Sequence, residues 1–127
     1  MKGVLRGDDA LACLDAGAAG IVVSNHGGRQ LDRAAAPAQA LREVAAAVGG
    51  RAPVLVDGGL RSGLDVLCAL ALGADAVLLG RPVLWALAAA GAQGVQACLE
   101  AVTDELAHVM GLAGARSLAE VTRDLVA

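Results

Sequence analysis

The stretch GIVVSNHGGRQLD, residues 20–32, joins a short apolar run to a cluster of glycines and polar groups. The run Ile21–Val23 is apolar at every position, which is typical of a strand covered on both faces. One of the two histidines of the chain, His26, follows it, with two glycines and Arg29 beside it. Because ligands of parallel α/β proteins gather where strands end, the sequence predicts a site at this histidine.

Two further apolar runs, Val54–Val56 and Val77–Leu79, have the same character, and helical patterns lie between the runs. The alternation predicts βα units with parallel strands and right-handed crossovers. We expect helices that start at Asp8 or Asp9, at Pro37, at Ser62 (a capping box with Asp65), at Pro82, at about Gly94 and at Ser117 (capped with Glu120), with ends near Gly17, Gly49, Gly73 and Met110.

The run Pro82–Leu99 carries no charge and reaches the lower edge of the length that spans a membrane. Two glycines and two glutamines interrupt it, so we interpret it as a buried helical region and expect no membrane span. Trp85 and His108 are interpreted as packing residues within helices. The charges at Arg6 and Asp8 do not fit a signal peptide at the N-terminus.

Composition narrows the class of protein. Of the 127 residues, 57% are hydrophobic, 17 are glycine and none is Tyr or Phe, which favours helices packed on a parallel sheet over a β-sandwich. A net charge of -3 without a basic cluster or aromatic platform argues against nucleic acid as a partner. The three cysteines, Cys13, Cys68 and Cys98, are too far apart for a disulfide framework or a metal motif. We therefore expect a reducing, cytoplasmic location.

The ends of the second and third apolar runs carry groups suited to an anion. Gly80–Pro82 passes from a strand into a helix, so free N–H groups and the positive end of the helix dipole meet the charge of an arginine. The glycines of Asp57–Gly59 allow a ligand to approach the backbone, and Arg61 can add a second charge. Each fragment alone also fits a plain turn with a surface arginine. Together, on consecutive strands, they predict a phosphate site.

His26 is the candidate general base, because an imidazole exchanges protons near neutral pH. A lone histidine is commonly a packing residue, but here the neighbouring glycines let a substrate approach. The planar fork of Arg29 can hold a carboxylate with two hydrogen bonds. A proton acceptor beside a carboxylate clamp suggests chemistry at a carbon or hydroxyl next to that carboxylate.

Three blocks resemble one family: KGV at residues 2–4, SNHGGRQLD at residues 24–32, and VLVDGGLRSGLDVLCALALGADAVLLGRP at residues 54–82. They are similar to the FMN-dependent 2-hydroxy acid oxidases and dehydrogenases, the group of glycolate oxidase, lactate oxidase and mandelate dehydrogenase. The resemblance implies a (β/α)8 barrel. Residues 1–127 would be the C-terminal half of this TIM barrel, from the end of strand 5 to helix 8 and the C-terminal helices, with parallel strands and covering helices.

The resemblance also implies a role for each motif residue. Lys2, which alone would pass for a solvated lysine, resembles the lysine beside the flavin ring, and Ser24 resembles a flavin contact. His26 corresponds to the active-site base and Arg29 to the arginine that binds the substrate carboxylate. The remaining cofactor-binding positions, similar to the family's FMN ribityl and phosphate site, are Asp57, Gly58, Gly59, Arg61, Gly80 and Arg81.

The expected activity is FMN-dependent oxidation of a small L-2-hydroxy acid to a 2-oxo acid, with oxygen, a quinone or a cytochrome as final acceptor and no metal. The alternative is a truncated half-barrel without catalysis, which keeps an FMN-phosphate-binding surface or needs a separate N-terminal half. A further alternative is another phosphate-binding FMN barrel with different chemistry, but such a protein would not need His26 and Arg29 in this arrangement. Since a barrel needs about 250 residues, the expected partners are a missing N-terminal half-barrel or a second copy of the chain.

Overall fold

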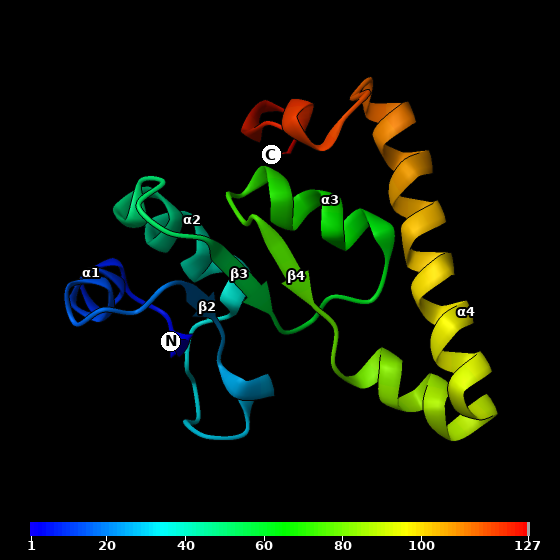
Figure 1. Ribbon diagram of the computed structural model, residues 1–127, viewed down its shortest axis with the longest axis horizontal. Coiled ribbons are helices and arrows are strands. Elements are labelled where there is room, and N and C mark those ends of the chain that lie inside the picture. Colours follow the sequence, from blue (N-terminus) through cyan, green and yellow to red (C-terminus); the bar gives the residue numbers. More distant parts are fainter. Residues whose placement is uncertain (127) are drawn as a thin grey trace.

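A computed structural model of the chain describes residues 1–126. Its centre is one sheet of four parallel strands in the order β1-β2-β3-β4, each strand beside its neighbour in sequence (Figure 1). The strands are β1 (Lys2–Val4), β2 (Ile21–Val23), β3 (Val54–Asp57) and β4 (Ala76–Leu78). The parallel βα order predicted from the apolar runs is confirmed.

The strand bounds differ slightly from the expected ones. β3 continues to Asp57 because this residue pairs with Leu78, and β4 starts and ends one residue earlier than the apolar run. β1 has no apolar run of its own, and only the resemblance to the family indicated it. It pairs with β2 through an irregularity between Lys2 and Val4.

Four helices and three 3-10 turns connect and follow the strands. They are α1 (Gly7–Asp15), α2 (Pro37–Val48), α3 (Gly63–Ala71), α4 (Arg81–Ala113), η1 (His26–Gly28), η2 (Leu118–Glu120) and η3 (Arg123–Leu125). The expected helix near Ser117 is thus only a single turn, and the Ser117 side chain does not cap it.

The helix ends follow ordinary capping chemistry. Ser62 accepts a hydrogen bond from the backbone of Asp65, which in turn accepts one from Ser62, so the predicted capping box is present. Gly49 ends α2 in the left-handed conformation. The expected cap at Asp8 or Asp9 is wrong, because both lie in the first turn of α1, where their charges still favour the helix dipole.

One face of the sheet is covered and contains the main core. Ile21, Val23, Val54 and Val56 point to this face and pack with apolar residues of the helices, among them Ala10, Leu41, Val44, Val48 and Ala69. On the opposite face Val22 and Leu55 are only half-buried, and Leu78 is 39% exposed. Coverage of both faces, expected from the apolar runs, is therefore wrong for the part of the chain that the structure describes.

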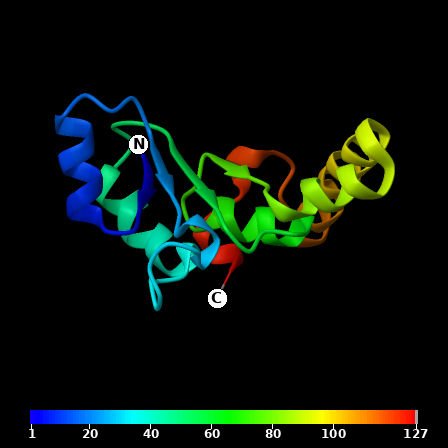
Figure 2. The ribbon, with the colours of Figure 1, turned by 90° about the horizontal axis from the view of Figure 1, so that it is seen from below.

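The expectation of a buried helix after Pro82 is also wrong. α4 packs along α3 (Figure 1), but none of its residues is fully buried. Non-helical backbone at Ala90 and Gly91 divides α4, and its first part extends away from the sheet (Figure 2). Trp85 is 54% exposed and His108 is exposed, because no described segment covers their side of the helix.

By length and composition α4 could cross a membrane, and it is the only such helix found in residues 1–126. The expected absence of a membrane span therefore stays a prediction.

Candidate functional site

Lys2, the first residue of β1, contacts side chains at the ends of β2 and β3. Its ammonium donates a hydrogen bond of 2.9 Å to Ser24 Oγ and pairs with the carboxylate of Asp57. Lys2 lies opposite Val22, so the alternation of side chains along a strand puts Lys2, Ser24 and Asp57 on the less covered face of the sheet. Ser24 is only 1% exposed, and the side chains of Lys2 and Asp57 are 43% and 21% exposed. The charge of Lys2 thus remains accessible from the strand ends.

The turn after β2 holds His26 in an uncommon backbone conformation. His26 has φ 56°, in the left-handed region, and its N–H donates to Ser24 Oγ at 3.1 Å. The side chain of Asn25 accepts a hydrogen bond of 3.1 Å from the N–H of Gly28. These bonds fix the backbone on both sides of His26. The residue itself is exposed at the end of β2.

The turn after β3 combines an unsatisfied acceptor with open backbone. Oδ1 of Asp57 is buried and has no hydrogen-bond partner among the described residues. Gly58 and Gly59 follow with φ 92° and 85°, which disfavours any side chain, and no atom lies within 4 Å of where a Cβ of Gly59 would be. A ligand hydroxyl that donates to Oδ1 would remove the cost of this buried acceptor.

The turn after β4 carries the anion-binding groups. Arg81 opens α4 directly after Gly80, and Pro82 follows in the first turn, where it needs no donor of its own. The guanidinium of Arg61 lies 5.8 Å from the centre of the Trp85 ring, so a cation–π contact ties the turn after β3 to α4. The positive end of the α4 dipole and two arginines therefore come together.

The three turns surround one cleft of about 310 Å³. It is lined by His26, Gly27, Arg29, Asp57, Gly58, Gly59, Leu60, Arg61, Leu78, Gly80, Arg81, Pro82 and Leu84. Eight of the ten residues expected at the site are among them. Of the other two, Lys2 contacts Asp57, and Ser24 contacts Lys2 and the N–H of His26. The arrangement expected from the sequence is thus present as geometry, at the carboxyl ends of the strands.

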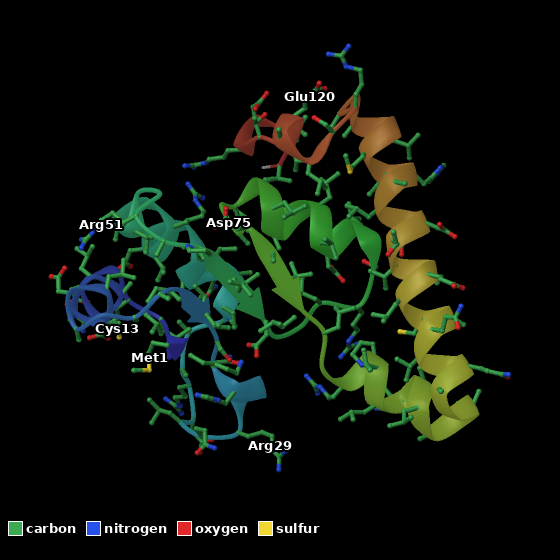
Figure 3. All side chains as sticks on the ribbon, in the orientation of Figure 1. Met1, Cys13, Arg29, Arg51, Asp75 and Glu120 are labelled. Atoms are coloured by element: carbon green, nitrogen blue, oxygen red, sulfur yellow. The ribbon has the colours of Figure 1, made fainter. Side chains whose placement is uncertain are left out.

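Charge in the cleft suits an anionic ligand. Three guanidinium groups and one carboxylate line it, although the chain as a whole has a net charge of -3. Arg29 is at the rim, and its side chain points away from the sheet (Figure 3). No group of three His, Cys, Asp or Glu side chains that could hold a metal occurs within residues 1–126.

The sequence did not single out Gly3 or Asn25. Gly3 lies next to the imidazole of His26, and Asn25 fixes the turn that carries it. Two signals were available, since both mark unusual backbone: a glycine inside a strand, and an asparagine two residues before a pair of glycines.

Fold and site together define part of a parallel (β/α) barrel with an anion-binding cleft at the carboxyl ends of its strands. The family described as FMN-dependent dehydrogenase matches residues 1–127, and the chain belongs to this family.

The chain is similar to several curated proteins along nearly its whole length. It is 58% identical to 4-hydroxymandelate oxidase of Amycolatopsis orientalis over 97% of the chain, and 52% identical to 2-hydroxyacid oxidase 2 of Rattus norvegicus over 99%. It covers only 34% and 36% of these two relatives. The chain therefore spans about a third of the length of the curated relatives that it matches.

Solved structures agree. Mandelate oxidase with (S)-4-hydroxymandelic acid matches with a TM-score of 0.93 and 59% identity, over 96% of this chain and 34% of that one. Mandelate oxidase with benzoyl-formic acid matches equally well and is covered to 36%. The expected fold class, part of a TIM barrel with parallel strands and covering helices, is confirmed, and the residues present fit the FMN of the family: a cationic anion seat, open glycine backbone and an unsatisfied acceptor at Asp57.

Proposed function

We propose that this chain provides the base, the carboxylate clamp and the phosphate seat of an FMN-dependent enzyme that oxidises an L-2-hydroxy acid to a 2-oxo acid. The observation that supports it most is the common cleft of His26, Arg29, Asp57 and Arg81, which come from three successive strand ends. Membership of the FMN-dependent dehydrogenase family supports the same reaction class.

Arg61, Arg81 and the start of α4 would hold the phosphate of FMN, because charge-assisted hydrogen bonds and a helix N-terminus favour a dianion. Oδ1 of Asp57 would accept from a ribityl hydroxyl, and the open backbone of Gly59 leaves room for it. Lys2 and Ser24 would contact the ring system. FMN, when bound, supplies the acceptor for two electrons.

The reaction converts the CH–OH group of the substrate to C=O, with loss of two electrons and two protons. His26 would take one of these protons at Nε2, FMN, when bound, would take up the two electrons and the other proton, and Arg29 would hold the nearby carboxylate. The side chain of Arg29 must turn from the rim toward the cleft to do so, and the glycines beside it leave space for that movement. The pairing of base and clamp makes the reaction specific for a carbon next to a carboxylate.

The chain spans about a third of its relatives, and both outer strands, β1 and β4, have a free edge. We propose that residues 1–127 act as the C-terminal portion of a barrel whose other strands cover the face that carries Lys2 and Leu55. Without them the chain is a half-barrel that keeps only the phosphate seat. A cytoplasmic location remains a prediction.

The test is a chimera in which this chain replaces the matching third of 4-hydroxymandelate oxidase. Loaded with FMN and mixed anaerobically with L-2-hydroxy acids, it should lose the visible absorbance of the flavin. His26→Asn should slow this by roughly 10²- to 10⁴-fold, the usual contribution of a general base. The matched control is Arg51→Gln, since Arg51 pairs with Asp15 on the surface far from the cleft (Figure 3).

Bleaching that His26→Asn leaves unchanged would contradict the role of the base. The half-barrel alternative is tested with the isolated chain, mixed with FMN and substrate. If the chain is a half-barrel without catalysis, it should bind FMN but not bleach it.

A further inference from the structure

Gly3 lies in the irregular part of β1, directly beside the imidazole of His26. Its φ is 92°, and the pairing with β2 shifts between its two neighbours, Lys2 and Val4. An irregularity of this kind lets a strand bend and redirects the neighbouring side chains. Gly3 therefore sits where β1 turns its backbone toward the site.

The imidazole occupies the space that a side chain at Gly3 would need. A Cβ on Gly3 would lie 2.6 Å from Nε2 of His26 and 3.5 Å from both Cδ2 and Cε1. Nε2 is thus the ring atom nearest to this position, and 2.6 Å is shorter than any normal carbon–nitrogen contact. Nε2, the nitrogen that we propose as the base, can occupy its position only if residue 3 has no side chain.

The backbones on both sides of this contact are held in place. Val22 donates to the carbonyl of Met1 at 2.8 Å, and Ser24 donates to the carbonyl of Val4 at 3.4 Å. The N–H of His26 is bound to Ser24 Oγ. The imidazole is the end of an exposed side chain that has other rotamers available, so a Cβ at Gly3 would displace the ring before it displaced either strand.

We propose that Gly3 is a positioning residue, whose missing side chain sets where Nε2 of His26 lies. Its consequence for catalysis rests on the proposed function, whereas the position of the ring can be measured without it. A ring moved by about an ångström is expected to lower turnover by up to 100-fold.

Gly17 provides a matched control. Its φ is 93°, nearly that of Gly3, but no atom lies within 4 Å of where its Cβ would be. Gly3→Ala and Gly17→Ala therefore introduce similar backbone strain, and only Gly3→Ala introduces a contact with the imidazole.

The measurement is NMR of the full chain with the second histidine replaced, His108→Gln, so that only the ring of His26 gives imidazole signals. In the parent, nuclear Overhauser contacts between this ring and the α-protons of Gly3 are expected. Gly3→Ala should shift both carbon-bound ring protons and remove those contacts, while Gly17→Ala should leave them unchanged. Ring signals that stay unchanged in Gly3→Ala would overturn the inference.

A double variant covers the case in which Gly3→Ala folds poorly. If Gly3→Ala destabilises the chain through its contact with the imidazole, it should do so less when His26 is replaced by alanine. Gly17→Ala should show no such coupling. Equal destabilisation in both backgrounds would contradict the proposal. Displaced ring signals in a chimera with normal turnover would support the positioning by Gly3 and contradict His26 as the base.

Discussion

At the scale of single residues, Ser24 is the hub of the candidate site. Its buried hydroxyl accepts from the ammonium of Lys2 and from the N–H of His26, and so connects β1 with the turn after β2. The family motifs predicted that Lys2, Ser24, His26 and Asp57 belong to one site. Their mutual contacts could not be predicted, because residues 2, 24 and 57 meet only when parallel strands are in register.

Ser24→Ala is expected to cost about 1–3 kcal/mol of unfolding free energy, because it leaves two donors without their acceptor in a partly buried place. Urea unfolding of the full chain measures it. Ser117→Ala is the control, since this serine makes no side-chain cap, and it should change stability by less than about 0.5 kcal/mol. Similar costs for the two variants would contradict the hub role of Ser24.

Gly63 is where α3 meets α4. A Cβ there would lie 2.1 Å from the backbone nitrogen of Leu106, and the N–H of Gly63 donates to Glu105 at 3.0 Å. Since the obstacle is backbone, Gly63→Ala should cost about 3 kcal/mol or more. Gly111→Ala, in α4 with nothing near its Cβ, should instead stabilise by about 0.5–1 kcal/mol. Thermal unfolding compares the two, and a neutral Gly63→Ala would contradict this packing.

At the scale of elements, apolar runs and caps were the informative signals. They predicted three strands and the starts of α2 and α3 because β-branched runs, Pro37 and the Ser62 box act locally. The exposure of α4 was not predictable, because an Ala- and Leu-rich helix has the same composition whether or not a neighbour covers it. The first strand was not predicted from the pattern, because Lys2 and Gly3 break its apolar run.

The segment after α4 has a pH-dependent contact. The N–H and guanidinium of Arg116 donate to the carboxylate of Glu120, and these bonds lower the pKa of Glu120. A carboxyl group whose pKa is lower in the folded state stabilises the fold at pH values above its pKa in the unfolded state. This contribution is lost as the pH falls through the lowered pKa. Glu120→Gln should therefore lose less stability on acidification than the parent chain.

Urea unfolding at neutral and at acid pH measures this difference. The pair lies between Ala115 and Val121, which pack against Leu67 and Ala71 of α3. Arg116→Gln should reduce the acid dependence in the same direction, and parallel pH profiles of all three proteins would contradict the assignment.

At the scale of the whole molecule, the chain is a one-sided sheet. The face with Val22, Leu55 and Leu78 lacks helices in residues 1–126, and two strand edges are free. Such edges favour pairing with other chains. The TIM-barrel assignment could be made from the sequence through family motifs, since four short strands alone do not specify how a sheet closes.

We expect the isolated chain to self-associate through this face and its edges, which sedimentation velocity detects. Leu78→Lys places a charge on the edge strand β4 and should shift the chain toward monomer. Leu112→Lys is the control, because Leu112 is 77% exposed near the end of α4, away from the sheet. An equal effect of both variants would contradict association through the sheet.

We infer that three strand ends form one site for FMN, which is held by its phosphate. The most direct measurement compares the affinities of FMN and riboflavin for the chimeric barrel and its Arg81→Gln variant, by quenching of flavin fluorescence. The parent is expected to bind FMN at least tenfold more tightly than riboflavin, and Arg81→Gln should remove most of this preference. Equal binding of the two flavins by the parent would contradict this inference.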